Sequence, residues 1–132
     1  MSRPAPDVGP EAGAYWAAAR EHRLVVQHCG HCDRLQHFPR AYCTVCLADD
    51  LEVVEVSGRG TVYSATVVRR PPGPAFTDLV PYVYALIDLD EGVRMTSGVI
   101  GCDPDDVRIG QRVRAVFEDL DDVSVVLFTP ED

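Results

Sequence analysis

The sequence predicts a mainly β protein with a short N-terminal helix, a zinc ribbon and a C-terminal OB-fold-like small β-barrel. Four of the five cysteines form two C-x-x-C pairs, and from residue 51 onwards the chain consists of short β-type segments between turn residues. A chain of 132 residues suits one domain, or one domain with a small appendage. We expect a tail and helix over residues 1–23, the zinc ribbon over 24–50 and the OB-fold domain over 51–132.

The segment "PEAGAYWAAAREHR" at residues 10–23 predicts a short helix. Pro10 suits the first helical position, and arginines near the end of the segment favour the negative end of the helix dipole. Tyr15 and Trp16 lie on one side of this helix, so that side is expected to pack on another surface. The helix is too short to be stable alone and must lean on the domain or on a partner. Residues 1–9 are proline-rich and aperiodic, which predicts a loose tail.

The stretch "CGHCDRLQHFPRAYCTVC" predicts a metal site. Each C-x-x-C turn places two sulfurs on one edge of a tetrahedron, and the ten residues between the pairs allow two short strands and a reversal. The strands are expected at 24–28 and 35–38. The expected ligands are the thiolates of Cys29, Cys32, Cys43 and Cys46. These ligands fit zinc, and iron uses the same set, so iron is not excluded.

Other uses of paired cysteines fit the sequence less well. A thioredoxin-like site needs a C-x-x-C that opens a helix in a βαβ unit, and no such unit is present. Disulfides need an oxidising compartment, whereas the chain shows no secretory signal and no apolar run of membrane length, so we expect a cytoplasmic protein. Four thiolates leave no open coordination position, so the metal is expected to be structural, with His28 and His31 outside its shell.

Alternating β segments fill the chain after residue 51. In "GTVYSATVVRR", for example, Val62 and Ser64 lie opposite Tyr63 and Ala65 in the alternation. Five or six short strands at this spacing predict a small closed or partly closed barrel, for which the OB-fold is the commonest match in size. The expected strand segments are 51–57, 60–70, 81–90, 92–100, 111–119 and 122–128.

Charge argues against one class of partner. The net charge is −9, and every one of the basic residues is arginine. An acidic surface repels phosphate backbones, so binding of nucleic acid would need a strong local basic patch. The only compact candidate is Arg69-Arg70, which is weak.

The sequence offers no independent catalytic set. Cys102 is the one cysteine outside the metal motif, and the aspartates that follow it would raise its thiol pKa. All four histidines lie between residues 22 and 37, away from the serines of the β region, so a serine triad is unsupported. The loop at 70–81, by contrast, is proline-stiffened and carries Phe76 and Leu79, which a purely solvated loop does not need.

Two motifs resemble a known family. They are the Phe38-Pro39-Arg40 step before the second cysteine pair and the "SGRGTVY" entry to the barrel at 57–63. With "LVVQHCGHC" and "VRIGQRVRAVFED", they make nearly the whole chain similar to the rubredoxin-like zinc-ribbon plus OB-fold family known as domain of unknown function 35. This resemblance implies the fold described above and carries over the four cysteine ligands position by position.

The resemblance also implies a function. Members accompany thiolases, lipid-transfer-protein-type aldolases of steroid side-chain breakdown and archaeal hydroxymethylglutaryl-CoA synthase assemblies. We therefore expect a subunit that is non-catalytic alone, forms a hetero-oligomer with a thiolase-like enzyme and helps to form its acyl-CoA site. The expected partner-interface residues are Tyr15, Trp16, Phe76 and Leu79. The candidate contacts for a CoA phosphate are Arg40, Arg69, Arg70 and Arg94. The alternative is an OB-fold and zinc-ribbon module that binds nucleic acid through a basic groove with aromatic stacking platforms.

Overall fold

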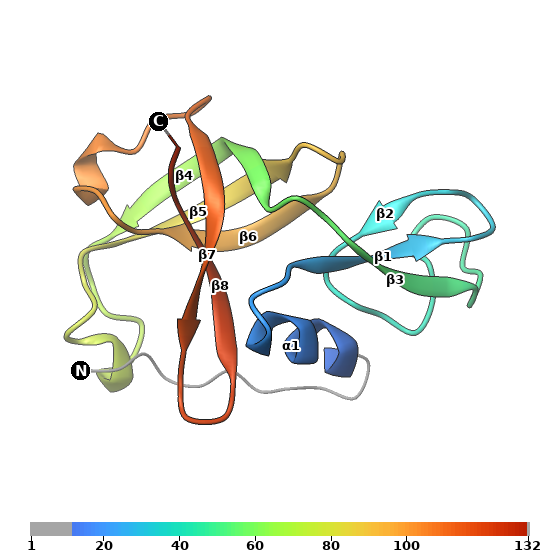
Figure 1. The fold of residues 1–132 in the computed structure, drawn as a ribbon. Helices are drawn as coiled ribbons and strands as arrows, with labels where there is room; N and C mark the ends of the chain where they lie inside the picture. The colour runs from blue at the N-terminus through green and yellow to red at the C-terminus, as the bar shows by residue number, and fades with distance from the viewer. Residues whose placement is uncertain (1–11, 132) are drawn as a thin grey trace.

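The computed structural model describes residues 12–131, which form a three-stranded sheet, a five-stranded barrel and one α-helix (Figure 1). The sheet stands to one side of the barrel, and the helix lies beneath the junction between them. The expected tail at 1–9 and the expected helix start at Pro10 lie outside the described residues. Within the described range, no helix has both the length and the apolar composition needed to cross a membrane.

The helix α1 spans Gly13–Arg20 and packs on its own chain. Tyr15 and Ala18 are buried on the side that faces the rest of the molecule. The helix ends when the N–H of Glu21 donates to the Ala18 carbonyl and the next residue, His22, adopts φ 61. This support from the same chain stabilises a helix that is too short to form alone.

Three antiparallel strands form the ribbon sheet: β1 (Val25–Cys29), β2 (Leu35–Gln36) and β3 (Leu51–Glu55). Their order is β2-β1-β3. The first C-x-x-C begins at the end of β1, and the second lies in the loop between β2 and β3, which brings it to the same end of the ribbon.

Strand β3 begins directly after the expected division of the chain at residue 50. It pairs with β1 over five residues, from Val25 opposite Glu55 to Cys29 opposite Leu51, and belongs to the ribbon sheet instead of the barrel. A β pattern shows that a strand forms but does not show which strand it pairs with. The ribbon sheet therefore extends to Glu55.

The barrel closes in the order β4-β5-β6-β8-β7, with β7 returning to β4. Its neighbours are antiparallel except β6 and β8, which are parallel and share one register pair, Val99 with Phe128. Short 3₁₀ turns lie in two of its loops, η2 at Pro74–Phe76 and η3 at Pro104–Asp106. The five strands are β4 (Arg59–Val68), β5 (Tyr82–Leu89), β6 (Arg94–Val99), β7 (Arg112–Asp119) and β8 (Ser124–Pro130). This confirms the predicted small OB-fold-like barrel.

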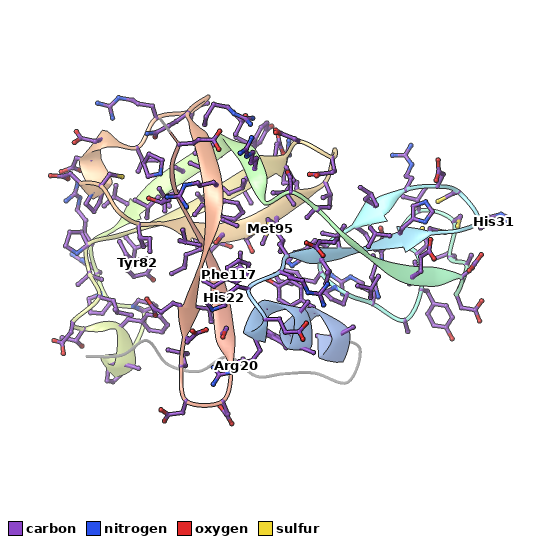
Figure 2. All side chains as sticks on the ribbon, in the orientation of Figure 1. Arg20, His22, His31, Tyr82, Met95 and Phe117 are labelled. Atoms are coloured by element: carbon purple, nitrogen blue, oxygen red, sulfur yellow. The ribbon has the colours of Figure 1, made fainter. Side chains whose placement is uncertain are left out.

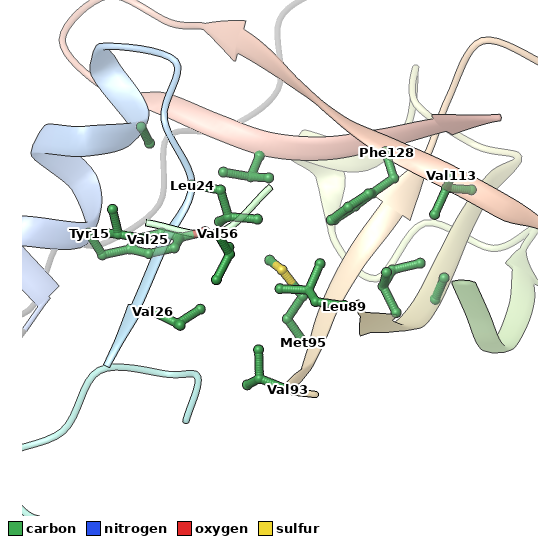
Figure 3. Packing of buried hydrophobic residues seen from close by; sticks show 14 of the residues in the cluster. Tyr15, Leu24, Val25, Val26, Val56, Leu89, Val93, Met95, Val113 and Phe128 are labelled. Carbon is green, nitrogen blue, oxygen red and sulfur yellow. The ribbon is translucent and has the colours of Figure 1, made fainter. Parts of the chain in front are cut away.

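One hydrophobic core joins the helix, the ribbon and the barrel (Figure 3). In β5, Val83, Ala85 and Ile87 point inward, as the alternating pattern predicts. Between the barrel and the ribbon, the core continues through the residues labelled in Figure 3: Tyr15, Leu24, Val25, Val26, Val56, Leu89, Val93, Met95, Val113 and Phe128. The ribbon is therefore packed against the barrel through apolar side chains.

Candidate functional site

The four predicted cysteine ligands lie together at one end of the ribbon. Their sulfur atoms all lie within 4.8 Å of one another, with Cys29 Sγ 3.6 Å from Cys46 Sγ and Cys32 Sγ 3.5 Å from Cys43 Sγ. Sulfurs around zinc at a Zn–S distance of about 2.3 Å are about 3.8 Å apart in a regular tetrahedron. The spacing of the cluster therefore fits one tetrahedral ion.

Local backbone geometry forms the two cysteine turns in the same way. The N–H of Asp33 donates to the Cys29 carbonyl, and the N–H of Leu47 donates to the Cys43 carbonyl. Asp33 and Leu47, the residues that follow each C-x-x-C, both have positive φ values, 66 and 65 degrees. Backbone N–H groups also point at sulfur, as Val45 N does at Cys43 Sγ over 3.4 Å. These turns hold the sulfurs ready for a metal ion.

The thiols have unequal acidity before a metal binds. Desolvation raises the pKa of Cys32 to about 12, whereas backbone N–H groups of Cys46 and Val45 lower the pKa of Cys43 to about 6. A divalent ion held by four sulfurs deprotonates all of them. Two of the four, Cys29 and Cys43, are fully buried, which excludes substrate from that side. The arrangement fits a structural metal ion with a closed thiolate shell.

The nearby histidines lie outside the ligand set. His28 lies between two carboxylates, with Nδ1 3.1 Å from Glu52 Oε1 and Nε2 2.5 Å from Asp33 Oδ1. The hydrogen bond to Asp33 is the main cause of the raised pKa of His28. Figure 2 places His31 at the outer end of the ribbon, where its side chain is exposed. Neither belongs to the cluster of four cysteine sulfurs.

Two buried glutamines fix the loop between the two cysteine pairs. This role was not predicted from the sequence. Gln27 on β1 and Gln36 on β2 occupy paired positions and are hydrogen-bonded to each other over 2.7 Å. Gln27 bonds both the N–H and the carbonyl of Arg40, and Gln36 accepts from the N–H of Thr44. The sequence does carry a signal for this role, because a polar glutamine follows an apolar residue in each of the two strand segments. Together they hold the 38–47 loop in one conformation.

The structure corrects part of the expected interface. Tyr15 is only 8% exposed and lies in the chain's own core, so its ring is not available to a partner in this conformation. Trp16 is half-buried against the same core and meets Tyr15 edge-on at 5.1 Å between ring centroids. Of the two supports expected for the helix, the domain or a partner, the structure shows the domain, because Tyr15 and Ala18 belong to the chain's own core.

The other two expected interface residues, Phe76 and Leu79, are half-buried in the loop between β4 and β5. The Phe76 ring centroid is 6.1 Å from that of Tyr82. Both rings line a concavity of about 360 Å³ on the outer face of the barrel, with Tyr84, Ile100 and Leu127. We call this concavity beside the 70–81 loop the barrel groove.

The four candidate arginines do not form one cluster. Arg69 is paired with Asp105 at 2.5 Å, and Arg94 is paired with Asp88 at 2.6 Å and lies 3.5 Å over the Tyr63 ring. Arg40 and Arg70 are exposed and make no ion pair within residues 12–131.

Only two of these arginines lie near the barrel groove. Arg69 and Arg70 directly follow Val68, which pairs with Tyr82 at one end of β5. Arg94 pairs with Asp88 towards the other end of the same strand, so about 20 Å separates the two positions.

Outside the cysteine cluster, the two candidate nucleophiles, Cys102 and Ser124, do not stand in an activating arrangement. Burial, with Asp106 and Asp103 nearby, raises the pKa of the Cys102 thiol, as the sequence predicted. Ser124 is buried and donates to Asp119, which also contacts His22. In this set the carboxylate stands between serine and imidazole, so the order differs from a catalytic triad, in which the imidazole contacts the serine.

Two family models match the chain. One is described as the rubredoxin-like zinc ribbon domain of ChsH2 and matches residues 16–52. The other is described as the C-terminal OB-fold domain of ChsH2 and matches residues 53–118. The matched ranges contain all four clustered cysteines and most of the barrel.

Several curated proteins are similar to the chain. It is 37% identical over 129 residues to the probable enoyl-CoA hydratase alpha subunit of Thermomonospora curvata, covering 97% of this chain and 40% of that protein. It is 35% identical over 127 residues to the 3-oxo-4,17-pregnadiene-20-carboxyl-CoA hydratase alpha subunit of Mycobacterium tuberculosis, again covering 40% of that protein. The chain thus spans about two fifths of these relatives. A DUF35 domain-containing scaffold protein of Methanothermobacter thermautotrophicus is 35% identical over 99 residues, 74% of each chain.

Solved structures resemble the chain over nearly its full length. A chain of the structure described as Ltp2-ChsH2(DUF35) aldolase is 36% identical, with a TM-score of 0.83 and coverage of 96% of this chain and 98% of that one. A DUF35-family protein of unknown function from Sulfolobus solfataricus has a TM-score of 0.66 at 17% identity, covering 94% of this chain and 87% of that one, and shows the shared fold. The chain belongs to the ChsH2-type zinc-ribbon and OB-fold family, DUF35.

Proposed function

We propose that the chain is a non-catalytic accessory subunit that binds a thiolase-superfamily enzyme, stabilises it and helps to form its acyl-CoA site. The observation that carries this proposal is the similarity to a chain of the Ltp2-ChsH2(DUF35) aldolase, with 98% of that chain aligned. Relatives described as scaffold proteins support the same role. The partner class includes thiolases, steroid side-chain aldolases and acyl-CoA synthases.

The chemistry of the described residues favours a subunit that binds a partner and does not itself carry the reacting group. The clustered thiolates would close the shell of one ion, the pKa of the Cys102 thiol is raised, and Ser124 is bonded to Asp119 instead of an imidazole. A subunit with these features contributes binding surface instead of a reacting group. Reduced thiolates also favour a reducing compartment, so we place the complex in the cytoplasm.

The barrel groove is our candidate for the subunit's share of the acyl-CoA site. Its walls, including Phe76, Tyr82 and Leu127, suit the apolar part of an acyl-CoA. Arg69 and Arg70 follow the strand end beside Tyr82, and a guanidinium can hold a phosphate bidentately. We assign Arg70 the phosphate contact, because Arg69 is paired with a carboxylate.

The alternative, a nucleic-acid module, is less consistent with the charges. Stacking platforms need cations along the same groove. Tyr63 and Tyr84 are half-exposed on the barrel, but the cation over Tyr63 is Arg94, which is paired with Asp88. The net charge of −9 opposes binding to phosphate backbones over the whole surface.

The proposal is tested by co-expressing the chain with the thiolase-like protein encoded nearest to it in the same genome. We expect a stable complex on size-exclusion chromatography, and Phe76→Asp should weaken it by tenfold or more, because the charge would have to be buried in an apolar contact. Ile109→Asp, at a highly exposed position of another loop, is the matched control. If the wild-type chain elutes alone, the accessory-subunit function is wrong.

A further inference from the structure

The ribbon carries an apolar surface that the proposed function has not yet used. Four large apolar side chains lie within one loop and are half or more exposed: Phe38 (51%), Tyr42 (60%), Val45 (59%) and Leu47 (75%). Tyr42 and Leu47 line a concavity of about 390 Å³ together with Arg40. We call this concavity, with its three side chains, the ribbon patch. Grouped exposure of this kind marks contact surfaces in soluble proteins.

The ribbon patch is held rigid from behind. Gln27 fixes the Arg40 peptide through two hydrogen bonds of 2.8 and 2.9 Å, and Gln36 accepts from Thr44 N over 3.0 Å. These glutamines are buried polar groups that must find partners, and they find them in this loop. A surface held in one conformation loses little entropy when it binds. The loop is therefore preorganised, although its apolar side chains face water.

Leu47 adds an independent observation. The turn after each C-x-x-C requires positive φ, and the equivalent residue of the first turn is Asp33, a type that tolerates this conformation. A bulky apolar residue with φ 65 is strained, and such strain concentrates at functional positions. A leucine at position 47 is thus unfavourable in two ways: its backbone has a positive φ, and its apolar side chain is exposed to water. The side chain is not buried in the chain's own core. Its side chain is explained by a contact outside the chain.

Charge indicates what occupies the patch. Arg40 is the only residue with a formal side-chain charge, among Asp, Glu, Lys and Arg, that lines the concavity, and it makes no ion pair with the described residues. A second copy of the chain, packed about a two-fold axis, would bring Arg40 against its own equivalent. An apolar side chain beside a carboxylate satisfies both the concavity and the guanidinium.

We propose that the ribbon patch is the docking site for a segment of the thiolase-like subunit that presents a large apolar side chain next to a carboxylate. This inference rests on the proposed function and adds the metal ribbon to the contact expected at Phe76. The barrel groove beside Phe76 is then a second, separate surface, which meets the partner around the acyl-CoA site.

The test uses a substitution that should keep or raise the stability of the isolated chain and should weaken its complex with the partner. Leu47→Asn puts a residue that tolerates positive φ at the strained position, so the thermal midpoint of the isolated chain should stay the same or rise. The same variant should weaken the complex with the co-purified thiolase-like subunit by tenfold or more. Ile109→Asn is the matched control, because Ile109 is exposed to nearly the same extent (74%) on a barrel loop and should leave affinity unchanged.

A second variant tests the charge. Arg40→Gln should weaken the complex and flatten its dependence on ionic strength, because an ion pair across the interface is screened by salt. If the wild type binds but Leu47→Asn and Arg40→Gln bind with the same affinity and salt dependence, the docking site is wrong and the proposed function stands. If the wild type binds no thiolase-like subunit, the proposed function and this inference both fall.

Discussion

At the scale of single residues, His37 is the most unusual ionisable group that the structure describes. Both of its ring nitrogens are buried and have no hydrogen-bond partner. Its ring centroid lies 5.1 Å from that of Tyr15 and 4.3 Å from that of Phe38. Burial lowers the pKa of His37 to about 4, and burial also raises the pKa of Tyr15 to about 12, so both rings are neutral near pH 7.

The prediction at this scale concerns acid. Because the folded-state pKa of His37 lies below its unfolded value of about 6.5, its contribution to stability is complete above that value and is lost as pH falls towards 4. Between pH 7.5 and 5.5 this corresponds to up to about 1.4 kcal/mol of unfolding free energy. Urea titrations at the two pH values should show this loss in the wild type and not in His37→Phe.

Metal content must be measured at both pH values, because loss of the ion would also destabilise the ribbon. An equal loss in the wild type and in His37→Phe, with the metal retained, would show that His37 does not cause the acid sensitivity.

At the scale of elements, the end of α1 is fastened to the β7–β8 hairpin. Arg20 donates to the carbonyls of Leu120 and Asp121 over 2.9 and 3.1 Å. His22 contacts Asp119 at 2.9 Å and stacks on Phe117 with ring planes 5° apart. Figure 2 shows His22 and Phe117 close together along this hairpin and Arg20 nearer its turn. The helix is thus fixed at its end by polar contacts as well as along its buried side.

Replacing Arg20 tests this attachment. Arg20→Ala removes a charged donor from carbonyls at the hairpin turn, so we expect a loss of about 1–3 kcal/mol of stability and faster hydrogen exchange in α1. Arg114→Ala is the control, because Arg114 is exposed on β7 and makes no ion pair in the described part of the chain. Equal exchange of α1 amides in both variants would contradict a fastening role for Arg20.

The local sequence pattern predicted where strands and metal ligands lie, but it did not predict which segments pack against each other. Alternation located the barrel strands, and C-x-x-C spacing identified the four ligands, because both signals lie within a few adjacent residues. The pairing of β3 with β1 and the burial of Tyr15 depend on residues far apart in the chain, which periodicity does not report. The glutamine pair was missed for the same reason, since Gln27 and Gln36 become partners only once the ribbon sheet has formed.

At the scale of the whole molecule, the metal cluster and the core act on the same strands. Strand β1 carries the ligand Cys29 at one end and the core residues Val25 and Val26 at the other. Losing the ion therefore removes the anchor from one end of the ribbon while the closed barrel keeps its own strand pairs. The ribbon depends on the ion more strongly than the barrel does.

Replacing one ligand should separate these two dependences. For Cys43→Ser we expect the metal content to fall from one zinc per chain to near zero, because a structural site contributes on the order of 10 kcal/mol of binding free energy to folding. Amide protection should be lost in β1, β2 and β3 and retained in β5, as hydrogen exchange with mass spectrometry would show. Cys102→Ser, outside the cluster, should keep the metal. Wild-type protein with less than about half an equivalent of zinc or iron by elemental analysis would contradict a metal site altogether.

The barrel closes through one parallel pair, Val99 with Phe128, and it therefore cannot close on the ribosome before β8 has been made. The ligands and the ribbon sheet are complete once Glu55 has been made, whereas β8 ends about 75 residues later at Pro130. At about 5–20 residues per second this is a delay of about 4–15 s. A nascent chain can therefore capture its ion and display the ribbon patch while the barrel is still unfinished. Assembly with a partner can begin before translation ends.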